Sequence, residues 1–375
     1  MTGKKLGVGV LGAHTWAEKA HLPGYANDPR VDLVAVCDVV PERAAAMAKM
    51  FNIRKVYTKP EDLIADPEVQ MVDVCTPTDT HYALGMAAIE AGKHVLCEKP
   101  IARSATEAFA LARAAEAAKV RTKVGFTFRY SPALRQIRAW IEDGTLGEIF
   151  HIHGLEQNSQ FLDPYFPLRQ VPQGADFQPK HPIPMSIVGY GSHLVDLVRW
   201  MGGEYKAVVS SMSNYMVERT VRGYEGLQKI NVDDGTVALV EFASGAQGML
   251  QTSIVAVGNY PGIEIRVYGS KAAAVGRLVT ERGIAETLHF ATADKVEFEP
   301  VTLPDSHFPP GTSLRTEWRE LYYRNLVRLW IGEILENRPP EGDFLDGARS
   351  QEIVDACVMA HVERRWVDLP LYPDA

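Results

Sequence analysis

The stretch HVLCEKP at residues 94–100 constrains the fold more than any other part of this chain. Its apolar run, Val95 to Cys97, is typical of a buried strand, and this run ends at Glu98 and Lys99. In open parallel sheets, the carboxyl end of a strand is where ligands bind. Pro100 ends the strand, so Lys99 extends from a stiff platform and can donate to a hydroxyl or carbonyl oxygen. For the stretch alone, the alternative is a solvated Glu-Lys pair that caps an ordinary strand.

A glycine turn between a strand and a helix lies upstream of this stretch. Residues 6–11 form a short apolar run, GAHTWA follows at 12–17, and helix-forming residues come next. This order is the first unit of a dinucleotide fold, in which the pyrophosphate sits at the helix N-terminus. Gly12 supplies the tight turn, but His14 occupies the second glycine position, so it must bend aside or itself contact a phosphate or the nicotinamide half. The cofactor-lining residues that we expect here are Gly12, Ala13, His14 and Trp16.

An acid at the end of the second strand indicates which dinucleotide binds. The apolar run 31–37 ends at Asp38, near the roughly 20-residue spacing from the glycine turn that is expected of a ribose-binding acid. A carboxylate there accepts hydrogen bonds from both ribose hydroxyls and repels a 2′-phosphate, so NAD is favoured over NADP. Arg43 is near enough to weaken this preference. A turn or helix cap before Pro41 is the alternative role for Asp38.

Strands and helices alternate through the first third of the chain. Further apolar runs at 69–75 and 122–126 alternate with alanine-rich helical segments. This spacing predicts a doubly wound parallel sheet with right-handed crossovers, an α/β domain over residues 1–125. Residues 126–375 are expected to form a second α/β domain, with the C-terminal helix returning toward the first.

The second domain is expected to contain an open, mostly antiparallel sheet. Along residues 148–157 the side chains alternate in character with a period of two, which is typical of a strand. Three long antiparallel strands are expected after it, at 236–242, 246–257 and 262–268. Turns at Ser244-Gly245 and Tyr260-Pro261 join these strands in sequence. Helices are expected at 131–143, 192–200, 313–337 and 346–364. The aromatic-rich segment 158–184 has no periodicity, and a loop this long is usually functional or mobile.

Composition narrows the class of protein and its partners. A chain of 375 residues is long enough for two domains, and its 46% hydrophobic and 23% charged residues are typical of a soluble globular protein. A net charge of −8 argues against nucleic acid and anionic membranes as partners. No apolar stretch approaches a membrane span, and no signal peptide is recognised. The four cysteines have no metal-binding spacing and three lie in apolar runs, so we expect no metal and a reduced, cytoplasmic compartment.

The order of the motifs resembles the glucose–fructose oxidoreductase and inositol dehydrogenase family (Gfo/Idh/MocA). The likeness rests on GAHTWA, Asp38, CTPTDTH, AGKHVLCEKP and VGFTFRYSP, and it continues through GSHLVDLVRWMGG, VYGSKAA and RRWVDLPL. It implies an N-terminal Rossmann domain and a second domain whose open sheet carries substrate and mediates a homodimer or homotetramer. It also implies NAD(P)-linked oxidation or reduction of a sugar or polyol.

The resemblance also assigns roles to single residues. It implies that Thr76, Pro77 and His81 line the cofactor. Glu98 and Lys99 would lie beside the nicotinamide, with Lys99 reaching the substrate oxygen and a cis bond between Lys99 and Pro100. The substrate contacts that we expect are Arg129, Tyr130, Gln157, Arg169 and His193.

One departure from the family pattern concerns the catalytic histidine. Relatives typically carry an aspartate four residues before the position of His193, completing a Lys-Asp-His cluster, whereas this chain has Gly189 there. An imidazole without that acid has a less defined tautomer, yet it can act as general base at neutral pH. Tyr190 is a candidate to contribute a phenol in place of the acid.

These observations predict an NAD-dependent dehydrogenase that acts on a secondary alcohol of a sugar, sugar derivative or polyol. Hydride passes to nicotinamide C4 while His193 accepts the hydroxyl proton, directly or through Lys99. One alternative is redox-neutral cleavage of a glycoside, through transient oxidation by a retained NAD. Another is a nucleotide-binding sensor that has lost catalysis, which Gly189 and His14 motivate.

Overall fold

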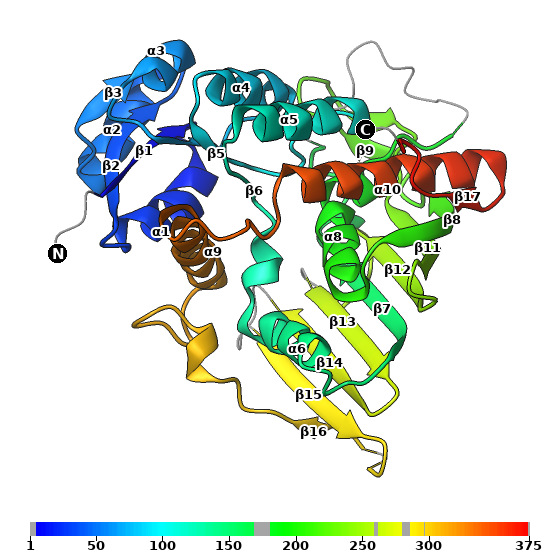
Figure 1. Ribbon diagram of the computed structural model, residues 1–375. Coiled ribbons are helices and arrows are strands. Elements are labelled where there is room, and N and C mark those ends of the chain that lie inside the picture. Colours follow the sequence, from blue (N-terminus) through cyan, green and yellow to red (C-terminus); the bar gives the residue numbers. More distant parts are fainter. Residues whose placement is uncertain (1–4, 169–180, 259–261, 280–285, 296, 374–375) are drawn as a thin grey trace. The chain divides into compact units, whose positions relative to one another are not determined.

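The structure is a computed structural model that describes residues 5–168, 181–258, 262–279, 286–295 and 297–373. The chain forms two units, each with its own sheet (Figure 1). The first contains the described residues of 1–131 and 305–351, and the second those of 132–304 and 352–373. This partition differs from the expected boundary at 125 and 126, because residues 305–351 return to the first unit.

A six-stranded parallel sheet organises the first unit. Its strand order is β3-β2-β1-β4-β5-β6, which is the order of a dinucleotide-binding sheet. The strands are β1 (Leu6–Leu11), β2 (Val31–Cys37), β3 (Lys55–Tyr57), β4 (Met71–Val74), β5 (His94–Cys97) and β6 (Thr122–Val124). The strand order reverses between β1 and β4, and ligands of such sheets bind beside that reversal.

Burial explains why the sequence predicts these strands well. Every residue of β1 and of β4 is buried, as expected of a parallel sheet with helices on both faces. Such strands form continuous apolar runs, and Asp73 within β4 is the exception.

The helices of the first unit come from two separate parts of the chain. The early ones are η1 (Ala17–His21), α1 (Leu22–Ala26), α2 (Pro41–Phe51), α3 (Pro60–Ala65), α4 (Thr78–Glu90), α5 (Ala105–Ala118) and η2 (Thr127–Tyr130). The later ones are η4 (Asp305–His307), α9 (Trp318–Leu335) and the first part of α10 (Phe344–Glu363). Local chemistry sets their ends: the Ser104 hydroxyl accepts from the Glu107 amide at the start of α5, and Pro41 occupies the first turn of α2.

Helix α9 lies against η1 and α1 in the first unit. It begins where the Glu317 side chain accepts hydrogen bonds from the amides of Arg319 and Glu320, which is later than the expected start at residue 313. A fully buried ion pair of 2.7 Å joins Lys123 of β6 to Glu333 of α9. The late segment is thereby connected to the parallel sheet.

A nine-stranded mixed sheet organises the second unit, in the order β16-β15-β14-β13-β7-β12-β11-β8-β17. Its strands are β7 (Ile149–Gln157), β8 (Tyr205–Ser213), β11 (Gly235–Phe242), β12 (Gln247–Ser253), β13 (Gly262–Gly269), β14 (Ala272–Val279), β15 (Glu286–Thr292), β16 (Glu299–Pro300) and β17 (Val367–Asp368). A separate two-stranded sheet pairs β9 (Glu218–Thr220) with β10 (Leu227–Lys229).

One expectation for this sheet is wrong. The sequence predicts that the second and third long strands pair with each other, but β7 lies between β12 and β13. It pairs parallel with β12 and antiparallel with β13. Strand β7 comes from an earlier part of the chain, and a period-two pattern carries no information about which neighbour a strand selects. The expected Tyr260-Pro261 turn lies outside the described residues.

Helices cover one face of the nine-stranded sheet. The helices of the second unit are α6 (Pro132–Glu142), η3 (Gln160–Leu162), α7 (Ser186–Gly189) and α8 (Gly191–Gly202), together with the last part of α10. Helix α8 packs on β7 and β12, and α6 packs on β14 and β15. On β11 the side chains alternate between buried Ala238 and half-exposed Leu239, so the opposite face is more open.

Candidate active site

The glycine turn lies at the carboxyl end of β1, next to the end of β4. The backbone φ of Gly12 is +99°, and a Cβ atom at this position would lie 2.0 Å from the carbonyl oxygen of Cys75. Only glycine therefore fits this turn. The Gly12 amide donates to the carbonyl of Cys37 at 2.8 Å, which fixes the turn against the end of β2.

Asp38 is held at the same edge by two backbone amides. Its carboxylate accepts from the Ala13 amide at 2.8 Å and from the Val40 amide at 2.9 Å. Each carboxylate oxygen has two lone pairs, so these bonds leave acceptor capacity for ribose hydroxyls. The side chain thus supports the turn and is also suited to the ribose role that the sequence predicts.

Backbone groups at this edge hold His14, and its contact with a cofactor stays a prediction. Its Nε2 lies 2.8 Å from the Cys75 carbonyl oxygen, and its Nδ1 accepts from the Trp16 amide at 3.2 Å. A single tautomer, with the proton on Nε2, satisfies both bonds. The ring is therefore held by the ends of β1 and β4 themselves.

His81 joins two of the loops that follow strands. Its ring nitrogens lie 2.7 Å from the Pro100 carbonyl oxygen and 2.8 Å from that of Thr76. The hydroxyl of Thr80 also bonds to the Thr76 hydroxyl at 2.7 Å and to the Pro77 carbonyl at 2.8 Å. These contacts indicate that His81 positions the loops after β4 and β5, and contact of Thr76, Pro77 and His81 with a cofactor stays a prediction.

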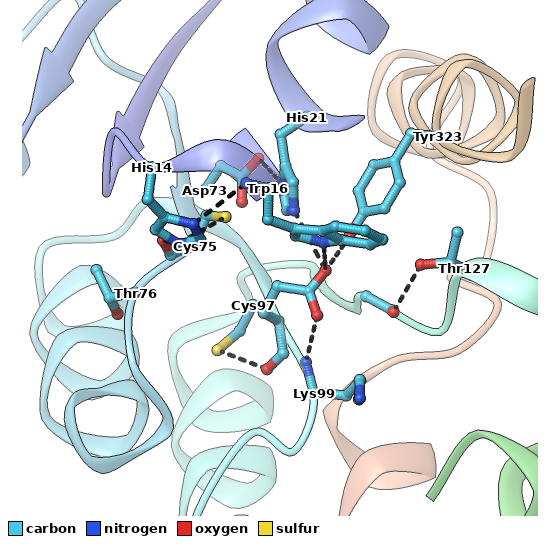
Figure 2. A network of polar contacts seen from close by, with 12 residues as sticks. His14, Trp16, His21, Asp73, Cys75, Thr76, Cys97, Lys99, Thr127 and Tyr323 are labelled. Carbon is cyan, nitrogen blue, oxygen red and sulfur yellow. Dashed lines mark hydrogen bonds and ion pairs between the residues drawn. The ribbon is translucent and has the colours of Figure 1, made fainter. Parts of the chain in front are cut away.

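Glu98 is the centre of a buried polar network (Figure 2). One carboxylate oxygen accepts from Trp16 Nε1 at 3.0 Å, from His21 Nε2 at 3.2 Å and from the Tyr323 hydroxyl. The other oxygen accepts from the Lys99 amide at 3.1 Å. Burial works to raise the pKa of Glu98, but the bond and charge of His21 and the charge of Lys99 outweigh it and lower the pKa.

His21 connects this carboxylate to a second one. Its Nδ1 lies 2.7 Å from an Asp73 oxygen, and both side chains are fully buried. Burial works to lower the pKa of His21, but the negative charge of Asp73 outweighs it and raises the pKa well above the usual value. Burial raises the pKa of the neighbouring Cys75 thiol to about 11, so this group is neutral at pH 7.

Lys99 follows this network directly. The peptide bond between Lys99 and Pro100 is cis, as the family resemblance implies. The lysine side chain is half-buried, unlike the buried residues of β5 before it. The Lys99 backbone nitrogen, labelled in Figure 2, donates to the Glu98 carboxylate at 3.1 Å. The network thus holds the Lys99 backbone, and the Lys99 side chain extends from that fixed point.

Two expected substrate contacts are buried within the first unit. Arg129 is paired with Asp346 at 3.1 Å, and its guanidinium stacks over Phe126. The Tyr130 hydroxyl donates to the Glu341 carbonyl at 3.5 Å. These contacts favour a structural role for both side chains, and their contact with substrate stays a prediction.

The expected catalytic histidine belongs to the second unit. His193 lies in the first turn of α8 and is 8% exposed. Tyr190 stands between α7 and α8, and its hydroxyl donates to Gln160 at 2.9 Å. A Cβ atom on Gly189 would meet no heavy atom within 4 Å, so a side chain can begin at this position without a clash.

Asp233 fixes the start of α7. Its carboxylate accepts from the amides of Met185, Ser186 and Ile187, the last two at 2.8 and 3.2 Å. Of the remaining substrate candidates, Gln157 is the half-buried last residue of β7, whereas Arg169 lies outside the described residues.

Sequence reasoning missed three members of the network: His21, Asp73 and Tyr323. Asp73 carries a recognisable signal, since it is an acid within an otherwise apolar strand. His21 ends a π-helical turn, a feature that is frequent at functional sites but has no clear sequence pattern. Tyr323 is 225 residues away from Glu98 in the chain, so local patterns cannot connect them.

Within the described residues, no cluster of three or more metal-ligating side chains is present. Those residues also contain no helix long and apolar enough to cross a membrane.

Comparison with known proteins covers nearly the whole chain. Residues 6–126 match an oxidoreductase family model with an NAD-binding Rossmann fold, and residues 134–275 match the GFO/IDH/MocA C-terminal domain. Levoglucosan dehydrogenase of Pseudarthrobacter phenanthrenivorans is 28% identical, over 98% of this chain and 99% of that protein. Myo-inositol 2-dehydrogenase of Thermotoga maritima is 27% identical, over 90% of this chain and 91% of that protein. A solved levoglucosan dehydrogenase in complex with NADH and levoglucosan superposes with a TM-score of 0.85 at 26% identity, covering 98% of this chain and all of that one.

Proposed function

Because the chain belongs to the Gfo/Idh/MocA family of NAD-binding oxidoreductases, we propose that it oxidises a secondary alcohol of a sugar, sugar derivative or polyol with NAD. The observation that carries this proposal is the sheet edge of the first unit. There the Gly12 turn, the Asp38 carboxylate and the Glu98-Lys99-Pro100 segment follow β1, β2 and β5 of one parallel sheet. That a turn suited to a dinucleotide and the Lys99 ammonium group follow strands of one sheet supports the proposal.

The residues at this edge fit NAD. Gly12 leaves the backbone open to a pyrophosphate, and the Asp38 carboxylate suits ribose hydroxyls while disfavouring a 2′-phosphate. When bound, NAD accepts a hydride at its nicotinamide ring. The fold positions the chain's own groups around that chemistry.

Proton handling falls to residues of this chain. Lys99 donates a hydrogen bond to the reacting oxygen, and its cationic side chain stabilises the negative charge that develops there. His193 accepts the hydroxyl proton, directly or through Lys99, and Tyr190 assists from the position beside it. The half-buried Lys99 and the placement of His193 in the first turn of α8 support these roles.

The relatives support the proposed substrate class. Those reported are dehydrogenases of an anhydrosugar and of a cyclic polyol, which share secondary hydroxyls on a six-membered ring. We infer the same class for this chain, with Gln157, Arg169 and His193 as its contacts. The relatives' names favour simple dehydrogenation over glycoside cleavage or sensing.

Assembly and location form a further part of the proposal. The open face of the nine-stranded sheet carries a row of residues in register, from Leu239 across Met249, His153 and Arg266 to Val275. We propose that this face joins copies of the chain into a homodimer or homotetramer, as the resemblance implies. All four cysteines are buried free thiols, which supports a reduced, cytoplasmic location. Light scattering on the wild type and on Leu239→Glu tests the assembly, and a monomeric wild type would contradict it.

One assay with two readouts tests the activity. Purified protein is incubated with NAD and a panel containing levoglucosan, myo-inositol, free sugars and aryl glycosides, while NADH and aglycone are followed together. We expect NADH in proportion to the substrate consumed and no aglycone. Aglycone release without net NADH would replace the proposal with redox-neutral cleavage. NAD binding without turnover of any compound would favour the sensor.

A further inference from the structure

The fully buried His21 lies between two carboxylates at the edge that carries Lys99. Its two ring nitrogens face Asp73 at 2.7 Å and Glu98 at 3.2 Å. Each carboxylate can only accept when ionised, so both contacts are satisfied together only if both nitrogens carry a proton. With both carboxylates ionised, the geometry fits an imidazolium in which each N–H has a carboxylate acceptor.

Glu98 must be ionised for its own hydrogen bonds to be satisfied. Its two oxygens receive four donors, namely an indole N–H, an imidazole N–H, a phenol O–H and the Lys99 amide. A protonated carboxyl would place its own hydrogen against one of them. The site is also closely packed, since a Cβ atom on Gly125 would lie 2.6 Å from a Glu98 oxygen.

The groups that face His21 come from several elements. They are Asp73 of β4, Cys75 after β4, Glu98 after β5 and Tyr323 of α9, and Tyr25 of α1 in turn faces Asp73. Burial and then the charge of Asp73 raise the pKa of the Tyr25 phenol, and the Cys75 thiol is neutral at pH 7. The charges around the ring are thus the two carboxylates, which a single imidazolium bridges.

We propose that His21 is a positioning residue: as an imidazolium between Asp73 and Glu98, it holds the Glu98 carboxylate on the Lys99 amide and thereby fixes the platform from which Lys99 acts. This inference rests on the proposed function for Lys99 and deepens it. His21 itself touches neither substrate nor cofactor. A neutral side chain in place of His21 removes the positive charge between Asp73 and Glu98. The two buried carboxylates are then uncompensated, so Glu98 takes up a proton more readily.

Nitrogen NMR of histidine-labelled protein tests the charge state without any substrate. We expect an imidazole that keeps both N–H protons from pH 6.5 to 9 and whose signal is absent from His21→Gln. A spectrum in which no imidazole stays doubly protonated over this range would overturn the proposal. So would a spectrum in which every doubly protonated signal of the wild type is still present in His21→Gln.

Kinetics test the positioning role. In His21→Gln we expect kcat to fall by up to about 100-fold, as for a misplaced reacting group, with NAD affinity within a few-fold of wild type. The acid limb of the kcat profile should move to higher pH, because Glu98 protonates more easily. The double variant with Glu98→Gln should lose no more than Glu98→Gln alone, since His21 acts through Glu98.

The matched control is Lys123→Gln. Lys123 is equally buried in the first unit, but it pairs with Glu333 outside the Glu98 network. Lys123→Gln should lower the free energy of unfolding but leave the pH profile of kcat unchanged. A wild-type profile in His21→Gln, or losses that multiply in the double variant, would overturn the proposal. A wild type that oxidises nothing in the panel would count against the proposed function, and the NMR signal would still decide the charge of His21.

Discussion

Replacement of Asp38 by alanine should weaken NAD binding by about two orders of magnitude. In the proposed complex, the carboxylate accepts hydrogen bonds from two ribose hydroxyls, and each bond to a charged acceptor contributes roughly 1.5–3 kcal/mol. At the lower value, loss of both bonds costs about 3 kcal/mol, which corresponds to about a 150-fold rise in Kd. The variant also removes the charge that opposes a 2′-phosphate, so discrimination against NADP should shrink.

The same variant has a second, independent consequence. Asp38 accepts from the amides of Ala13 and Val40, and these bonds do not involve NAD. Their loss should lower the free energy of unfolding by about 3 kcal/mol, less whatever entering water recovers. A suitable control is Asp32→Ala on the same strand, because Asp32 forms only a half-exposed ion pair with Arg54 at 3.1 Å. Such pairs contribute about 1 kcal/mol or less.

Isothermal titration with NAD and with NADP, at a temperature where all variants are folded, measures these effects. Asp38→Asn retains one acceptor oxygen and should fall between wild type and Asp38→Ala. An NAD affinity within twofold of wild type in Asp38→Ala, with the same preference over NADP, would refute the assignment. The ribose would then bind elsewhere, and Asp38 would act only as a turn residue.

Three further predictions concern other parts of the chain. The free energy of unfolding of Gly189→Asp should lie within about 0.5 kcal/mol of the wild-type value, because its Cβ meets open space. The new carboxylate should stabilise protonated His193 and so shift the acid limb of the kcat/KM profile to higher pH. A pH profile equal to that of Gly189→Ala would contradict the role of His193 as the base. Lys123→Met should lower the free energy of unfolding by about 3–5 kcal/mol in urea titrations, because Glu333 stays buried without its partner. The double variant with Glu333→Leu should recover most of that loss. Losses that add in the double variant would contradict the prediction. The pKa of His21 is raised in the folded state, so its contribution to stability is complete below about pH 6.5 and is lost as the pH rises through the folded-state pKa. The free energy of unfolding of the wild type should therefore fall with pH by up to about 1.4 kcal/mol per unit more than that of His21→Gln. Equal pH dependence of the two proteins in urea titrations at pH 7, 8 and 9 would contradict this prediction.

The first sheet was predictable because its strands are buried on both faces. Continuous apolar runs, each ending in a polar or glycine residue, locate β1, β2, β4 and β5 to within two residues. The glycine turn and Asp38 follow from their places at strand ends. The cis bond before Pro100 follows from the family resemblance rather than from local chemistry.

The second sheet was less predictable because pairing is a long-range property. The alternation in β7 shows a half-buried strand, but it does not show that β12 and β13 lie on either side. The buried network has the same difficulty. His21 and Asp73 are 52 residues apart in sequence, and a histidine on a helix near the N-terminus gives no sign of its acidic partners.

The most direct test of the central claim follows the hydrogen itself. Each accepted sugar or polyol is supplied with deuterium at one carbinol carbon at a time, together with NAD, and the reduced cofactor is examined by mass spectrometry and NMR. We predict that one labelled position transfers its deuterium to nicotinamide C4, which also identifies the oxidised carbon. Failure of every labelled position to deliver deuterium to the cofactor would contradict hydride transfer from a secondary alcohol to NAD.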